Sequence, residues 1–144
     1  MTDRLTILDQ IEEDLNDKLK PTNGYNFQPA SIKRGLHKFT DFPEKPAVCF
    51  TLVGDEPHEL EEFGEGARWL RFFFYGYHVT DGMGVTDNIQ KLAQDVEDFL
   101  ASTDNSFVED TMIGNMEVLE GGVSSPLCSF IIEVSILYNR ECIE

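Results

Sequence analysis

The stretch that decides the fold is Arg68-Trp-Leu-Arg-Phe-Phe-Phe-Tyr-Gly-Tyr-His-Val79. Its residues alternate between two apolar sets, namely Trp69, Phe73, Tyr75, Tyr77 and Val79 on one parity, interrupted by Arg71, and Leu70, Phe72 and Phe74 on the other. Successive side chains of a strand point to opposite faces of its sheet. The pattern therefore predicts a long strand that needs cover on both faces.

Other strand-like segments lie on both sides of this stretch, at residues 31–36, 47–53, 111–119 and 127–138. Residues 47–53 form a continuous apolar run, which predicts a central strand, and Pro46 stands just before it, where a missing N–H does little harm. In residues 127–138, apolar side chains from Cys128 to Tyr138 alternate with more polar ones. We therefore expect one face of this strand to lie in the core and the other to be partly exposed to solvent.

Two segments have helical periodicity. The first has an apolar stripe of Leu5, Leu8, Ile11, Leu15 and Leu19, and Pro21 with Asn23-Gly24 ends it. The second begins at the N-cap Thr86-Asp87 and has its stripe at Ile89, Leu92, Val96, Phe99 and Leu100, while Gln90, Gln94, Asp95, Glu97 and Asp98 are expected to point outward. Two helices cannot cover both faces of a parallel sheet. We therefore expect one α+β domain over residues 1–144, with a mixed, mainly antiparallel sheet of four to five strands and two main helices packed on it.

Charge and hydropathy exclude several classes of protein. The chain of 144 residues has 27 acidic and 11 basic residues, which gives a formal net charge of −16. Binding nucleic acid by neutralising phosphates needs clustered Lys and Arg, so the charge argues against that function. No apolar run approaches the roughly 20 residues of a membrane helix, and Met1-Thr-Asp-Arg4 does not resemble a signal peptide. We expect a soluble intracellular protein that has no membrane partner.

The sequence contains fragments of several catalytic and ligand-binding motifs, but none of these motifs is complete. His58-Glu-Leu-Glu-Glu62 has Glu62 where a zinc protease helix has its second histidine. Gly82 and Gly84 match two glycines of a phosphate-binding loop, but the third glycine is missing. Asp81 and Asp87 do not have the spacing of a calcium-binding loop. The segment Gly121-Gly-Val-Ser-Ser125 does not match the G-x-S-x-G pattern of a nucleophile elbow. Cys49 and Cys128 are expected to be buried thiols and Cys142 an exposed one. The sequence predicts no catalytic residue, no metal and no cofactor, hence no enzyme.

The segment from Gly54 to Gly66 is the most unusual part of the chain. It contains six acids and no Lys or Arg, and it separates two strong strand signals, so we expect a long acidic hairpin loop at residues 54–66. Loops of this length in small domains are usually functional or disordered. The candidate assembly-interface residues are Asp55, Glu56, Glu59, Leu60, Glu61, Glu62, Phe63 and Glu65, with Leu60 and Phe63 as apolar anchors.

The order of these patterns resembles a known family. The Leu/Ile-striped helix is followed by Pro46-Ala-Val-Cys-Phe50, a long charged loop and Arg68-Trp-Leu-Arg-Phe72. The helix through Leu92, Asp95-Val-Glu97 and Phe99 and a last alternating strand ending at Tyr138 complete the pattern. This order is similar to that of the tail terminator (tail completion) proteins of long-tailed bacteriophages, small α+β subunits that act as hexameric rings. The likeness covers most of the chain and rests on order and pattern.

The resemblance implies a structural virion protein of the tail or neck, assembled in the host bacterial cytoplasm. Such a ring caps the tail tube, ends its polymerisation and provides the joint to the head and neck. The implied partners are further copies of the chain, the tail tube protein, a head-completion or neck protein, and genomic DNA that passes through the lumen without sequence-specific binding. Three alternatives remain open: another phage neck or head–tail connector protein, an acidic DNA-mimic inhibitor, and a small hydrolase or metal enzyme, which a stoichiometric bound metal would support.

Overall fold

A computed structural model describes residues 4–35, 44–57, 67–79, 87–102, 108–119 and 127–139 of the chain. Helix α1 (Arg4–Lys18) is followed by a 3-10 turn, η1 (Pro21–Asn23), and then by β1 (Ser31–Arg34), β2 (Ala47–Pro57) and β3 (Ala67–Val79). Helix α2 (Asp87–Ala101), β4 (Val108–Leu119) and β5 (Leu127–Asn139) complete the order. The two helices and one mixed sheet confirm the α+β class.

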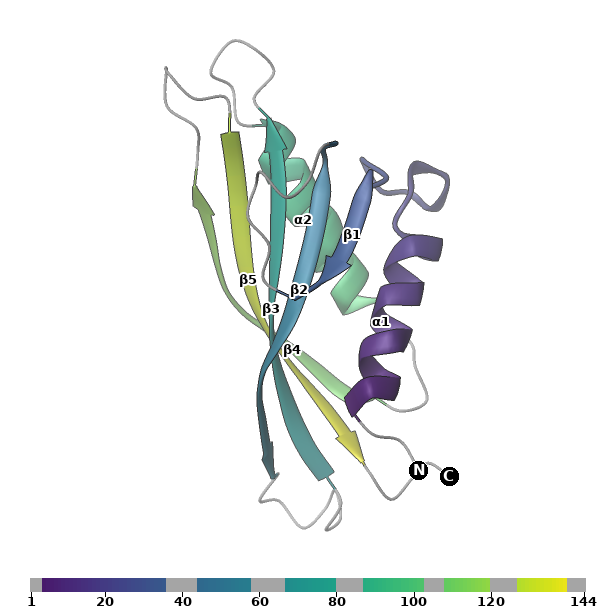
Figure 1. Cartoon of the computed structure of the whole chain (residues 1–144), viewed down its shortest axis with the longest axis vertical. Helices are drawn as coiled ribbons and strands as arrows, with labels where there is room; N and C mark the ends of the chain where they lie inside the picture. Colours follow the sequence, from purple (N-terminus) through teal and green to yellow (C-terminus); the bar gives the residue numbers. More distant parts are fainter. Residues whose placement is uncertain are drawn as a thin grey trace.

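The five strands form one strongly twisted sheet in the order β1-β2-β3-β5-β4 (Figure 1). The short β1 pairs with β2 in parallel, and the other three pairs are antiparallel. β2 lies between β1 and β3, which confirms the predicted interior position of residues 47–53. β3 is the central strand, and β4 forms the edge opposite β1.

The main core lies on one face of the sheet. Its cluster joins apolar residues of both helices to strand residues of a single parity, among them Phe50, Phe74 and Cys128. On the opposite face, Ala47 and Cys49 form a small separate cluster with half-buried tyrosines. Both cysteines are buried, as predicted. Among the described elements, both helices pack against the same side of the sheet, while the other side of β3 is half-buried apart from Arg71. We call the other side the helix-free face.

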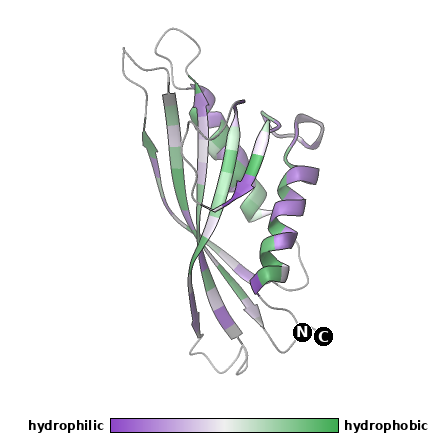
Figure 2. Ribbon diagram, viewed as in Figure 1, coloured by the Kyte–Doolittle hydropathy of each residue, from purple (hydrophilic) through white to green (hydrophobic). Residues whose placement is uncertain are grey.

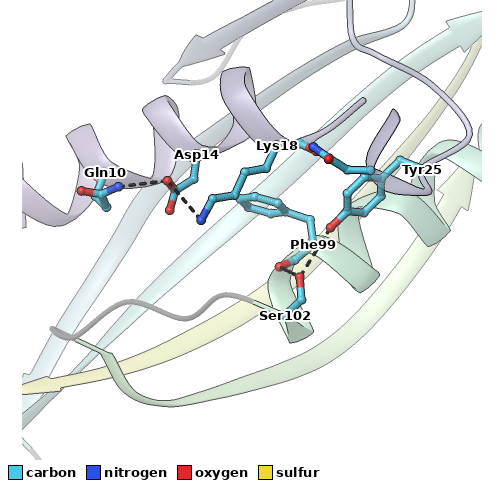
Figure 3. A network of polar contacts seen from close by, with 7 residues as sticks. Gln10, Asp14, Lys18, Tyr25, Phe99 and Ser102 are labelled. Atoms are coloured by element: carbon cyan, nitrogen blue, oxygen red, sulfur yellow. Dashed lines mark hydrogen bonds and ion pairs between the residues drawn. The ribbon is translucent and has the colours of Figure 1, made fainter. Parts of the chain in front are cut away.

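Helix α1 buries most of the predicted stripe, with Ile7 in place of Leu5. Ile7, Ile11, Leu15 and Leu19 are buried at a spacing of four residues, whereas Leu5 is 64% exposed. Figure 2 shows apolar and polar residues alternating along this helix. Asp14 is also buried; it accepts a hydrogen bond of 2.9 Å from Gln10 Nε2 and lies 3.7 Å from Lys18 Nζ (Figure 3). The apolar stripe thus rotates toward Ile7, and a paired carboxylate completes the inner face.

Asp95 of α2 corrects a sequence prediction. Helical periodicity places it on the outer side of the helix, but it is only 2% exposed. Its Oδ1 accepts hydrogen bonds from Asn26 N at 2.9 Å and Asn26 Nδ2 at 3.0 Å, and its Oδ2 accepts one from Phe27 N at 2.9 Å. Buried carboxylates persist where hydrogen bonds compensate their lost hydration. This set of contacts, the Asp95 clamp, therefore fixes the segment that leads from α1 into β1 onto helix α2.

A second contact joins the same two parts of the chain. Tyr25 Oη lies 3.4 Å from Ser102 Oγ at the end of α2, and Ser102 Oγ donates to the carbonyl of Phe99 at 3.1 Å (Figure 3). Gly24 ends the 3-10 turn with φ +93°, and its N–H donates to the Pro21 carbonyl. This left-handed conformation favours glycine and turns the chain toward Asp95.

Candidate assembly surface

The predicted interface residues begin at the paired ends of β2 and β3, which we call the hairpin end (residues 54–57 and 67–71). β2 continues to Pro57, and Asp55 and Glu56 pair with Leu70 and Trp69 of β3. The expectation that the hairpin loop starts at residue 54 is therefore wrong. The strand extends further because the ladder to β3 continues past a register shift between Leu52 and Gly54.

Asp55 is held by two arginines from different elements. Arg68 Nε on β3 donates to Asp55 Oδ1 at 2.6 Å, and Arg4 Nε on α1 lies 3.6 Å from Asp55 Oδ2. The hydrogen bond to Asp55 raises the pKa of Arg68 above its ordinary value, outweighing the opposite effect of burial. The Asp55 side chain is 15% exposed, so it acts as an internal tie between α1, β2 and β3.

Glu56 keeps a more open position beside Arg71. Arg71 Nε lies 3.5 Å from Glu56 Oε1, and both side chains are largely exposed. A Cβ on Gly54 would lie 3.0 Å from Arg71 Nε, so the glycine leaves room for the arginine to lie across β2. Of the two acids that the structure describes here, Glu56 is the one accessible to another molecule.

The other predicted interface residues lie outside the described residues: Glu59, Leu60, Glu61, Glu62, Phe63 and Glu65. The composition of the acidic segment, which has no Lys or Arg, did not indicate that arginines would face its first residues. The sequence could have indicated Arg68 and Arg71, because they follow the segment directly and an antiparallel hairpin folds them back onto it. The partnership of Arg4 depends on tertiary packing and had no local signal.

The helix-free face carries aromatic side chains next to the hairpin end. Trp69, Phe73, Tyr75 and Tyr77 are all half-buried on this side of β3. Phe73 and Tyr75 meet edge to face, with ring centroids 6.3 Å apart. Aromatic rings that cover one another shield much of a sheet face without a helix. The remaining exposed area is a surface on which another protein could pack.

No family model matches the chain, and no curated protein matches it. Within the described ranges, no helix is long and apolar enough to span a membrane.

Few buried groups in the described part of the chain could take part in catalysis or bind a metal. His78 is buried on the core face; its Nδ1 accepts a hydrogen bond of 2.8 Å from Val79 N, and its Nε2 has no hydrogen-bond partner among the described residues. Burial lowers the pKa of His78 below 6.5, which favours the neutral ring. The ring of Phe27 meets it edge to face at 4.9 Å. His78 is thus packed as a core residue, and among the described residues no three His, Cys, Asp or Glu form a cluster that could hold a metal.

Proposed function

We propose that this chain is a structural subunit that caps the tail tube of a long-tailed bacteriophage as a ring of six copies. In this role it ends polymerisation of the tube protein and joins the tube to the neck of the head. Its partners are neighbouring copies, the tube protein and a head-completion or neck protein, and the genome passes through its lumen. The order of helix and strand patterns along the chain suggests this role.

The observation that carries the proposal is the helix-free face beside the hairpin end. Trp69 and Phe73 stay half-buried there although both helices pack on the other side of the sheet. Apolar side chains that stay partly exposed on a sheet face offer a contact surface to another protein. A neighbouring subunit would bury these rings, and the firmly paired hairpin end would hold the acidic segment beside that contact.

Net charge supports the same role and adds a condition for assembly. Six copies at −16 each carry 6 × −16 = −96 formal charges, so a free ring repels itself. Charges separated by more than about 10 Å are largely screened at 0.1 M salt, so salt should favour the ring. An acidic lumen also repels DNA phosphates, which would let the genome pass without adhering.

The decisive experiment combines mass photometry with electron microscopy, with and without purified tail tubes, across a series of salt concentrations. We expect small species in dilute solution at low salt, closed rings at high salt, and rings on tube ends when tubes are present. A chain that stays monomeric at every salt concentration and leaves tube ends bare would overturn the proposal.

A charge-reversal variant tests the acidic segment within this assembly. Changing Glu59, Glu61 and Glu62 to Lys should leave the fold intact and abolish capping, because these acids are expected to meet basic groups of the partner. The matched control changes three other acids to Lys and alters net charge equally: Glu13, Asp17 and Asp98, which are exposed on the two helices. If both variants cap tubes alike, the segment is only a connector.

A further inference from the structure

The outer strand β4 forms an exposed edge of the sheet. It pairs with β5 on one side and stands at the end of the strand order, and its residues 112–117 are all exposed. Met112 is 58% exposed and Leu119 72%, both on the helix-free face, while Ile113 and Met116 are exposed on the other face. Sheet edges are usually protected from strand addition by charged side chains, above all Lys, by Pro or by β-bulges. Residues 108–119 contain no Lys or Pro, and although the ladder to β5 is irregular between Val108 and Asp110 and between Ile113 and Met116, regular stretches at residues 110–113 and 116–119 can accept another strand.

A hollow lies beside the C-terminal half of this edge, on the helix-free face. It has a volume of about 260 Å³, and its lining includes Tyr75, Tyr77, Glu117, Leu119, Ser129 and Ile131. The sheet register explains it, since Ser129 stands between Leu119 on β4 and Tyr77 on β3. A small side chain between two large ones leaves a depression, which we call the corner hollow.

The corner hollow has the chemistry of a site for a basic side chain. Two tyrosine rings line it, and aromatic rings attract guanidinium and ammonium groups. Glu117 adds a carboxylate, which can form a bidentate pair with arginine. Leu119 and Ile131 offer apolar surface for the aliphatic stem of such a side chain.

We propose that β4 and the corner hollow together bind an extended strand of a different protein that carries an arginine or lysine. The strand adds to the outer edge of β4 through backbone hydrogen bonds, and its basic side chain enters the corner hollow. Strand addition takes affinity from the backbone and specificity from pockets for alternate side chains.

Charge selects a different protein over a second copy of this chain. Residues 108–119 hold Glu109, Asp110 and Glu117 and no cation, so pairing two β4 edges would bring three acids against three. The cationic strand of this chain, β1, forms the opposite edge of the sheet, and its Arg34 binds two acids of α1. The inference goes beyond the ring proposal and does not depend on it, because the hollow lies at the other end of β3 from the hairpin end.

The test uses the free chain and a cyclic β-hairpin peptide whose outer strand alternates Thr and Val around one central Arg. The matched control peptide has citrulline in place of that Arg, which keeps the shape and removes the charge. Fluorescence anisotropy should give a dissociation constant at least about tenfold lower for the Arg peptide. Hydrogen exchange should show new protection in residues 108–119 when it binds.

Variants locate the two parts of the site. Glu117→Gln should remove most of the preference for Arg, whereas Glu133→Gln, on the same face but outside the hollow, should preserve it. Met112→Lys should block the basic strand, and Leu5→Lys, at an exposed apolar residue on α1, should not. Circular dichroism melts establish that each variant is folded.

Three results with the peptides would overturn the proposal: equal affinity for both peptides, no binding of either at about 1 mM peptide in low salt, or protection that appears outside β4. Sedimentation of the chain alone tests whether a second copy of the chain binds at this edge instead. Self-association that Met112→Lys abolishes would assign this edge to a second copy, and our proposal would then be wrong. None of these measurements needs tail tubes, so a failure of the ring proposal would be seen separately.

Discussion

Replacing Asp95 by alanine should destabilise the protein more than any other single change of an acidic residue on α2. The substitution removes three hydrogen bonds to a carboxylate, two from Asn26 and one from Phe27 N. Hydrogen bonds to charged groups contribute roughly 1.5–3 kcal/mol each. Asn26 is exposed, so water can replace most of its loss, whereas Phe27 is half-buried and leaves an unpaired N–H. We therefore expect the free energy of unfolding to fall by about 2–4 kcal/mol.

Urea unfolding followed by the fluorescence of Trp69, the one tryptophan of the chain, measures this loss. Asp95→Asn keeps the size of the side chain but directs an NH2 group at a backbone N–H donor, so it should also destabilise by more than about 1 kcal/mol. Asp98→Ala is the matched control, because this exposed acid lies on the same helix and should change stability by less than about 0.5 kcal/mol. Equal midpoints for Asp95→Ala and Asp98→Ala would refute the clamp.

Three further predictions concern the core. Gly76→Ala should prevent folding or destabilise severely, because its Cβ would lie 1.8 Å from the ring of Phe130, and adding Phe130→Leu should restore part of the stability in urea titrations. Phe99→Ala should cost about 3–5 kcal/mol in the same assay, since Phe99 is buried in the main cluster; an unchanged midpoint would mean that the inner face of α2 is misplaced. Burial lowers the pKa of His78 below 6.5, so the unfolded chain binds a proton first as the pH falls, and the free energy of unfolding should drop below pH 6.5 down to the pKa of the folded state. His78→Phe should lose this part of the pH dependence, and an identical pH profile would contradict the assignment.

Strong local periodicity predicted most of the fold. Residues 67–79 and 127–139 form strands as their apolar alternation indicated, and α2 buries Val96 and Phe99 as its stripe required. These elements were predictable because their apolar residues follow the period of the structure they form. The sheet order and the parallel pairing of β1 carry no local signal, since they depend on how segments far apart in sequence meet.

The errors arise where a polar residue has a distant partner. Asp95 has the sequence context of a solvated helix position, yet the backbone of Asn26 and Phe27 makes its burial favourable. Asp55 falls in a segment whose composition predicts a free loop, and arginines of α1 and β3 instead fix it at a strand end. The corner hollow depends on a serine of β5 lying between two large side chains, which only the register reveals.

The Asp95 clamp also has a consequence for synthesis on the ribosome. Phe27 and its carboxylate partner are 68 residues apart, so the segment leading into β1 leaves the ribosome long before α2 can hold it. At about 5–20 residues per second, the interval is about 3–14 s. During that time the apolar stripe of α1 is exposed, because the helix and strands that later cover it have not yet been made. The N-terminal third of this chain is therefore the part expected to need protection by a chaperone while translation continues.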